Sequence, residues 1–334
     1  MYYKILFTIS LMIGTLITIS SYSWMGMWLG LEINLLSIIP LMSSTENMMA
    51  SEAALKYFIV QAMASTFLLF SIIILSLNFM YTQTNLYFTL ILNTSLLTKM
   101  GAAPFHFWFP EVMDGLNWNL SLIMLTWQKL APMIILTYFN SPSNYLILII
   151  IASMMISGLL GINQTSLRKI LAYSSINHIG WMLSTILIME TVWLYYFIIY
   201  SIITVNIITI FKMLNIFHLK QLFISMNYNP LIKFFFIMNF LSLGGLPPFL
   251  GFLPKWLTIQ TLIQNQIYTL PIMMTIMTLL TLYFYLRITF STILISSNEV
   301  SFYNHPPIKT TWILIFNLIA LIGLIFITML FNFL

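Results

Sequence analysis

The chain contains no cysteine and very little charge. Its 334 residues include 12 Lys and Arg, 7 Asp and Glu and 4 His, and charged residues make up 6% of the sequence. The absence of cysteine excludes disulfides, thiolate iron–sulfur ligation and a cysteine nucleophile on this chain. The few basic residues form no Lys/Arg run, which excludes nucleic acid as an expected partner.

Motifs for cofactors are missing as well. The sequence has no G-x-G-x-x-G after a strand, no P-loop and no cluster of His and carboxylates with metal-ligand spacing. We therefore expect no metal and no cofactor on this chain, and no direct binding of NADH.

Apolar residues, in contrast, are abundant. They make up 60% of the sequence, and the mean hydropathy is +0.99. A chain of this composition is expected to lie in a lipid bilayer, which predicts an all-α polytopic membrane protein. Windows of about 20 residues give about eleven transmembrane helices. They run over residues 5–21, 24–42, 52–77, 86–110, 117–138, 143–162, 166–189, 192–217, 231–264, 268–294 and 310–333.

Two of these spans contain the same interruption. The pattern G-x-x-P-F, with a further Pro five residues on, occurs at residues 101–105 and again, 144 positions later, at residues 245–249. Gly and Pro interrupt the hydrogen bonds of a membrane helix and leave backbone N–H and C=O groups without partners. Such groups are tolerated only where protein or a water-filled cavity satisfies them. The pattern predicts two broken helices, which are typical of ion pathways in transporters.

The offset of 144 residues also predicts an internal repeat. It places the first five spans on the sixth to tenth, so we expect one membrane domain with a five-helix repeat over 5–138, a second over 143–294 and a closing helix over 310–333. Because five is odd, the second copy enters the membrane from the opposite side, as in inverted-topology transporters.

Five ionisable residues lie near the middle of predicted spans: Glu32, Lys99, Lys129, His178 and Lys255. A charge at a helix centre costs about 2.5–3.5 kcal/mol, so several of them indicate function. Burial disfavours a lysine's charged form and a nearby carboxylate favours it, which lets such a lysine take up and release a proton. The alternatives are a structural ion pair of Glu32 with Lys99 or Lys129, and a histidine that only joins two helices.

The loops predict an orientation. Eight basic residues fall on the side of the N-terminus, which the positive-inside rule assigns to the cytoplasm-equivalent face, although they could also be lysines that only snorkel from helix ends. They are Lys4, Lys56, Arg168, Lys169, Lys212, Lys220, Lys233 and Lys309. Tryptophans near span ends are expected to be interface anchors. They are Trp24, Trp28, Trp108, Trp118, Trp193 and Trp312.

Six strings carry a resemblance to a known family. They are WLGLE at 28–32, SEAALKYF at 51–58, APFHFW at 103–108, LTWQKLAP at 125–132, YSSINHIGW at 173–181 and GFLPKW at 251–256. With them the chain resembles, over essentially its whole length, the antiporter-like proton-pumping subunits of respiratory complex I (NADH:ubiquinone oxidoreductase) of animal mitochondria. That family is related to Mrp-type cation/proton antiporters.

The resemblance implies roles for the buried residues. Glu32 matches the family's buried glutamate, Lys99 its partner on the first broken helix, Lys129 the central lysine and Lys255 the lysine of the second broken helix. Together with His178 they would relay protons while other subunits oxidise NADH and reduce ubiquinone.

It further implies a multi-pass protein of the mitochondrial inner membrane, with its N-terminus on the matrix side and with other membrane-arm subunits as partners. Bacterial members have additional N-terminal helices, so another subunit is expected to cover that flank. Two alternatives remain open at this point: a stand-alone cation/proton antiporter and a purely structural membrane spacer.

Overall fold

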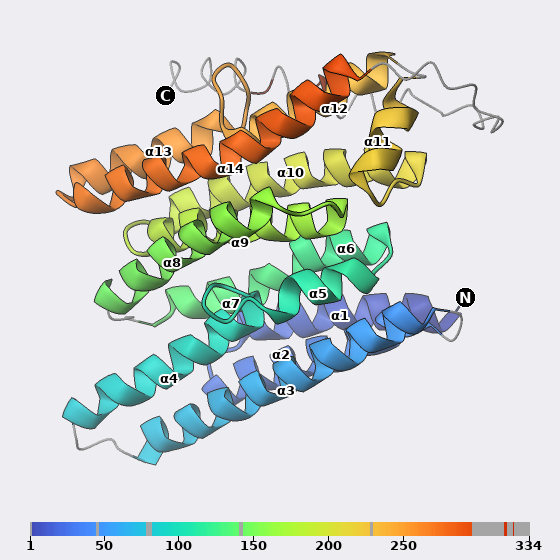
Figure 1. Ribbon diagram of the computed structural model, residues 1–334. Helices are drawn as coiled ribbons and strands as arrows, with labels where there is room; N and C mark the ends of the chain where they lie inside the picture. The colour runs from blue at the N-terminus through green and yellow to red at the C-terminus, as the bar shows by residue number, and fades with distance from the viewer. Residues whose placement is uncertain are drawn as a thin grey trace. The chain divides into compact units, whose positions relative to one another are not determined.

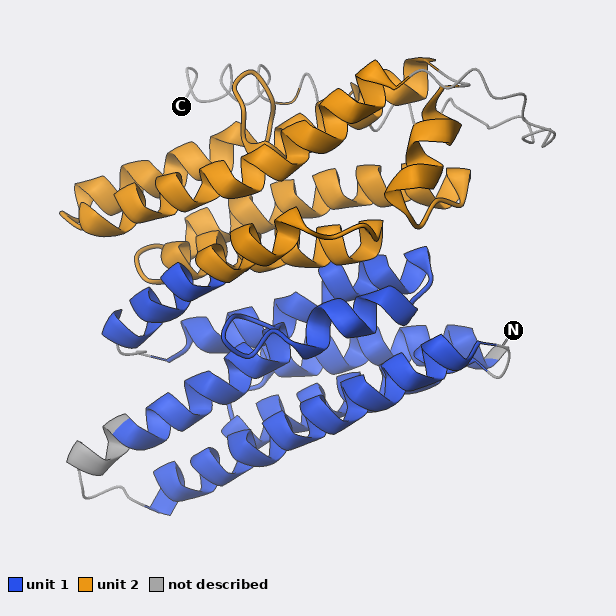
Figure 2. Ribbon diagram, viewed as in Figure 1, with its two compact units in different colours: residues 1–153 blue, residues 154–334 orange. Residues whose placement is uncertain are grey.

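The computed structural model describes residues 2–44, 47–77, 82–139, 143–227 and 230–295, together with residues 317, 318 and 323. These residues form helices α1 to α14, without a strand in the described ranges (Figure 1). The expected all-α polytopic fold is confirmed. The chain divides into two compact units, unit 1 (Met1–Ser153) and unit 2 (Met154–Leu334), shown in Figure 2.

Unit 1 is built around a close crossing of its first two helices. A Cβ on Gly30 would lie 2.5 Å from Cγ2 of Thr18 and 2.8 Å from the carbonyl oxygen of Gly14, so only glycine allows this approach. The crossing fixes the helix that carries Glu32. The helices of this unit are α1 (Tyr2–Ser20), α2 (Trp24–Met42), α3 (Met48–Leu77), α4 (Thr82–Met100), α5 (Trp108–Gly115), α6 (Trp118–Leu125), α7 (Trp127–Thr137) and the first part of α8 (Ser143–Ile162).

In unit 2, α10 packs against α9, α12 and α13, and α14 packs against α9, α11, α12 and α13. The rings of Phe211, Phe236 and Phe240 meet between α10 and α12. The helices are the rest of α8, α9 (Leu167–Ile186), α10 (Glu190–Leu214), α11 (Leu219–Met226), α12 (Pro230–Gly244), α13 (Phe252–Gln264) and α14 (Thr269–Leu294). The long helices α9, α10 and α14 supply the walls of the site described below.

Seven described helices are long and apolar enough to cross a membrane: α1, α2, α3, α8, α10, α14 and the continuous stretch Trp118–Thr137 that contains α6 and α7. The predicted spans 86–110 and 231–264 are each divided between two helices. The number of eleven spans therefore stays a prediction, and the closing helix over 310–333 falls almost entirely outside the described residues.

The repeat also stays a prediction. The two compact units divide between Ser153 and Met154, inside α8, whereas the expected repeats meet between residues 138 and 143. Two features were not expected at all. One is the short helix α11, and the other is an interruption at Thr126 within the predicted span 117–138.

The interpretation of the tryptophans as interface anchors is wrong for Trp108, Trp118 and Trp193, which are buried in the protein. Trp24 is exposed, in agreement with an anchor. The indole N–H of Trp28 donates to the Ser65 carbonyl, 3.2 Å away, and so joins α2 to α3. Trp312 lies outside the described residues.

Candidate functional site

The first broken helix ends at Met100 and resumes at Trp108. Gly101 adopts φ +76°, the left-handed region that favours glycine. The Thr98 carbonyl oxygen accepts the indole N–H of Trp108 at 3.1 Å, and the Lys99 carbonyl oxygen accepts the Gln61 amide at 3.1 Å. The predicted interruption is confirmed, and the Gln61 side chain satisfies a carbonyl that the break leaves open.

The second broken helix has the same form with a different partner. The chain leaves α12 at Gly244, turns at Gly245 with φ +76° and resumes a helix at Phe252. Here the ammonium of Lys255 donates to the carbonyl oxygens of Leu243 at 3.3 Å and Gly244 at 2.8 Å. The negative end of the α12 dipole therefore faces the buried positive charge.

A small polar cavity lies beside Lys99 in unit 1. Its volume is about 10 Å³, which is room for about one water molecule. The side chain of Lys99, only 7% exposed, lines it together with Asn34, Tyr57, Gln61 and Gln128. The Gln128 amide donates to Asn34 Oδ1 at 2.9 Å, and the Tyr57 hydroxyl donates to Gln128 Oε1 at 3.4 Å. These groups place α2, α3, α4 and α7 around one hydrogen-bonding space.

Glu32 belongs to the same region. It is half-buried on α2, and its charge interacts with Lys99 and with Tyr57. The alternative of a direct ion pair between Glu32 and Lys99 is not supported, since the two side chains form none in the described part of the chain. Glu32 Oε1 is buried without a hydrogen-bond partner in the described part of the chain. The carboxylate and the ammonium therefore act on each other through their charges, without direct contact.

Lys129 lies at the interruption that the sequence did not predict. Thr126 separates α6 from α7, its hydroxyl donates to the Leu122 carbonyl at 2.8 Å, and its own carbonyl accepts the Lys129 N–H at 3.2 Å. The Lys129 side chain is 1% exposed, and its ammonium lies 5.5 Å from the ring centroid of Phe109. Because Gln128 precedes it directly, Lys129 is adjacent to the polar network of unit 1.

Unit 2 contains the remaining two predicted residues, His178 on α9 and Lys255 on α13. His178 is 4% exposed on α9, and its Nδ1 hydrogen-bonds the Tyr196 hydroxyl of α10 at 2.8 Å. Trp181, three residues further along α9, has its ring centroid 5.9 Å from the ammonium of Lys255. Residues three apart on a helix share a face, so His178 and the Lys255 side chain lie along the same side of α9.

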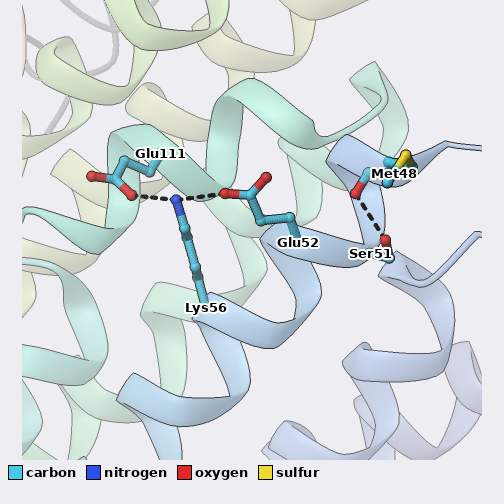
Figure 3. Close-up of polar contacts among 5 residues, drawn as sticks. All are labelled: Met48, Ser51, Glu52, Lys56 and Glu111. Carbon is cyan, nitrogen blue, oxygen red and sulfur yellow. Dashed lines mark hydrogen bonds and ion pairs between the residues drawn. The ribbon is translucent and has the colours of Figure 1, made fainter.

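Lys56 differs from the buried lysines. Its ammonium lies 2.9 Å from Glu52 Oε1 and 2.7 Å from Glu111 Oε2, between carboxylates of α3 and α5 (Figure 3). All three side chains are substantially exposed, a setting in which ion pairs contribute little stability. Sequence spacing could have indicated the Glu52 pair, which is an i,i+4 pair, but not the pair with Glu111.

Sequence reasoning missed the amides and the phenol of unit 1, namely Asn34, Tyr57, Gln61 and Gln128. The available signal was a polar side chain inside an apolar span, because burying such a side chain costs free energy unless it is hydrogen-bonded. In unit 2 it also missed the tyrosines that approach His178, because a tyrosine in an apolar helix is ordinary.

The chain belongs to the NADH:quinone oxidoreductase/Mrp antiporter transmembrane family, whose sequence model matches residues 21–281. Among curated relatives, NADH-ubiquinone oxidoreductase chain 2 of Aedes aegypti is 50% identical over 333 residues, covering 98% of this chain and 97% of the relative. The chain 2 protein of Anopheles gambiae is 48% identical over 335 residues, with the same coverage. A chain of respiratory complex I from Thermus thermophilus matches with a TM-score of 0.87 and 25% identity, over 97% of this chain and 78% of that one.

Proposed function

We propose that this chain is a proton-translocating subunit of the membrane arm of NADH:ubiquinone oxidoreductase. The observation that carries the proposal is the placement of three buried lysines at interruptions of apolar helices: Lys99 and Lys255 at the repeated breaks and Lys129 beside Thr126. Burying a charged ammonium costs much more free energy than burying a neutral amine. Each of these lysines can therefore bind and release a proton as its surroundings change.

In unit 1 the proposed steps start from Glu32 and Lys99. A negative Glu32 attracts a proton to Lys99, whose side chain lines the polar cavity with Gln61 and Gln128. Neutralising Glu32 weakens that attraction and favours release of the proton. The amide of Gln128 and the hydroxyl of Tyr57 supply hydrogen-bonding groups on the way to Lys129.

In unit 2 the proposed carrier is Lys255, with His178 as a second site. The carbonyl oxygens of Leu243 and Gly244 accept hydrogen bonds from the protonated amine, and they are available because the last carbonyls of α12 have no intrahelical partner. His178 lies on α9 in hydrogen-bond contact with Tyr196, where a neutral imidazole can accept a proton at one nitrogen and release it from the other. The oxidation of NADH and the reduction of ubiquinone belong to other subunits.

The setting of the protein follows from the same proposal. It would cross the mitochondrial inner membrane several times, bind other membrane-arm subunits and contact lipid along its exposed apolar helices. The loops on the same side of the membrane as the N-terminus carry the excess of basic residues, which favours an N-terminus in the matrix.

A stand-alone cation/proton antiporter is the second candidate, because the matching family also contains Mrp antiporters. Purification from mitochondria under native conditions separates the two. As a complex I subunit, the chain should co-migrate with NADH dehydrogenase activity, and membranes lacking it should lose NADH-driven proton uptake. Cation/proton exchange by the isolated chain in liposomes, with normal NADH-driven pumping in its absence, would contradict the proposal.

A further inference from the structure

Two tyrosines of α10 approach His178 in the interior of unit 2. Tyr196 and Tyr200 are four residues apart, so both lie on the face of α10 that is turned toward α9. The Tyr196 hydroxyl hydrogen-bonds His178 Nδ1 at 2.8 Å, and the ring of Tyr200 lies 5.0 Å from the imidazole, centroid to centroid. Both tyrosines are buried. The imidazole is therefore flanked by two phenol rings, and the Tyr196 hydroxyl is close enough to Nδ1 for proton transfer.

The polar contacts continue beyond this pair. The side chain of Ser175, one turn before His178 on α9, lies near enough to the Tyr200 hydroxyl to interact with it. Tyr285 of α14 is also buried and lies near enough to interact electrostatically with both Tyr196 and Tyr200. We call Tyr196, Tyr200 and Tyr285 the tyrosine cluster. Two tyrosines of α10 thus contact the histidine, and the third, from α14, lies near those two tyrosines.

The same face of α9 leads from His178 to Lys255. Trp181 lies three residues after His178, about 4.5 Å along the helix axis, and its ring is 5.9 Å from the Lys255 ammonium. The Trp181 indole N–H is buried and has no hydrogen-bond partner in the described part of the chain. A buried donor of this kind is commonly satisfied by an ordered water molecule.

Packing alone does not account for the hydroxyls. Phenylalanine would fill nearly the same volume at positions 196, 200 and 285 without burying a polar group, and removing a hydroxyl from water costs energy unless it is hydrogen-bonded. A tyrosine hydroxyl, however, donates and accepts at the same time. This property is useful where a proton has to cross an apolar interior.

We propose that Tyr196 and Tyr200, joined to Lys255 through His178, form a hydroxyl relay that conducts protons through unit 2. The inference deepens the proposed function and rests on it. A proton from the Lys255 ammonium passes through water to Nε2 of His178 and gives an imidazolium. The Nδ1 proton then moves to the Tyr196 oxygen while the hydroxyl proton of Tyr196 leaves for the next hydroxyl or water. One O–H bond forms as another breaks, so Tyr196 carries no net charge and His178 returns to its neutral form.

The experiment uses the whole complex in liposomes, with NADH-driven proton uptake normalised to the amount of assembled complex. Tyr196→Phe removes the hydroxyl and keeps the ring. Its matched control is Tyr195→Phe, the preceding residue of α10, which is 57% exposed against 1% for Tyr196. We expect Tyr196→Phe to slow uptake about tenfold or more, since removal of a proton-transfer group typically costs 10²–10⁴-fold before bypass by water, and Tyr195→Phe to leave it unchanged.

A second pair of variants distinguishes a relay from packing. His178→Gln keeps a hydrogen-bonding group opposite Tyr196 but cannot carry a proton, so the double variant with Tyr196→Phe should be no slower than the worse single variant, within about twofold. Wild-type uptake in assembled Tyr196→Phe would overturn the relay. If Tyr196→Phe does not assemble, Tyr200→Phe is measured by the same criterion. Failure of the proposed function is distinct, because Lys129→Met in unit 1 would then also pump normally.

Discussion

The ammonium of Lys255 lies 2.8 Å from the carbonyl oxygen of Gly244, the last residue of α12. A second hydrogen bond reaches the Leu243 carbonyl, so one side chain satisfies two carbonyls that the broken helix leaves open. At the first broken helix, Gln61 and Trp108 donate to backbone carbonyls instead, and the side chain of Lys99 lines a polar cavity. Two copies of one sequence pattern therefore hold their lysines in different ways.

The position of the Lys255 side chain depends on Gly245. A Cβ at this position would lie 2.7 Å from Lys255 Cδ and 2.9 Å from its ammonium nitrogen, and φ is +76°. We expect Gly245→Ala to displace the lysine and to lower NADH-driven proton uptake per assembled complex. Gly101→Ala is the control: its φ is also +76°, but the nearest atom to its Cβ would be Phe109 Cβ at 3.2 Å.

Both alanine variants should lose about 1–2 kcal/mol of stability from the left-handed backbone, which assembly yield and thermal denaturation would report. Only Gly245→Ala should reduce pumping beyond what the loss of assembled complex explains. Equal pumping defects in the two variants would mean that contact with Lys255 is not the cause.

Gln61 is predicted to stabilise the first break. Its amide donates to the Lys99 carbonyl inside the protein, so Gln61→Met should leave that carbonyl without this donor and cost about 1–3 kcal/mol. Gln164→Met is the matched control, because Gln164 also donates to a helix carbonyl, that of Leu160, but at an exposed site. Its effect should stay within about 0.5 kcal/mol. Thermal denaturation of the purified complex checks both, and equal shifts would contradict the role of Gln61.

Glu32 and Lys99 should be coupled although they form no direct ion pair. Each of Glu32→Gln and Lys99→Met should reduce pumping, and the double variant should lose less than the product of the two single losses, by about 0.5–3 kcal/mol of coupling. Lys56→Met, which removes an exposed lysine, should leave the effect of Glu32→Gln unchanged. Single losses that simply multiply in the double variant would show that the two charges act independently.

Parts of this architecture were predictable from the sequence because their causes are local. The breaks after Met100 and Gly244 were predicted because glycine and proline interrupt helices, and the burial of Lys129 was predicted from its place in an apolar span. The interruption at Thr126 has no glycine or proline at the break itself. The only nearby signal is Pro132, which removes a helix N–H within α7.

The remaining features depend on residues far apart in the chain. Nothing near Gln61 in sequence indicates that it reaches the Lys99 carbonyl, 38 residues away. A direct ion pair of Glu32 with Lys99 was one alternative suggested by charge, yet charge does not fix distance, and the two side chains form no ion pair in the described part of the chain. Tyr196 came into view only once α10 was placed beside His178, since a single tyrosine in an apolar helix is ordinary.

The central claim is that Lys129 passes protons, and Lys129→Met tests it most directly. Methionine keeps the length and the apolar fit of a side chain that is 1% exposed but cannot bind a proton. Lys56→Met is the matched control, because it removes the same charge from an exposed site. The measurement is NADH-driven proton uptake by the assembled complex in liposomes. The account predicts a loss of most of the uptake for Lys129→Met and little change for Lys56→Met, and wild-type uptake by fully assembled Lys129→Met would contradict it.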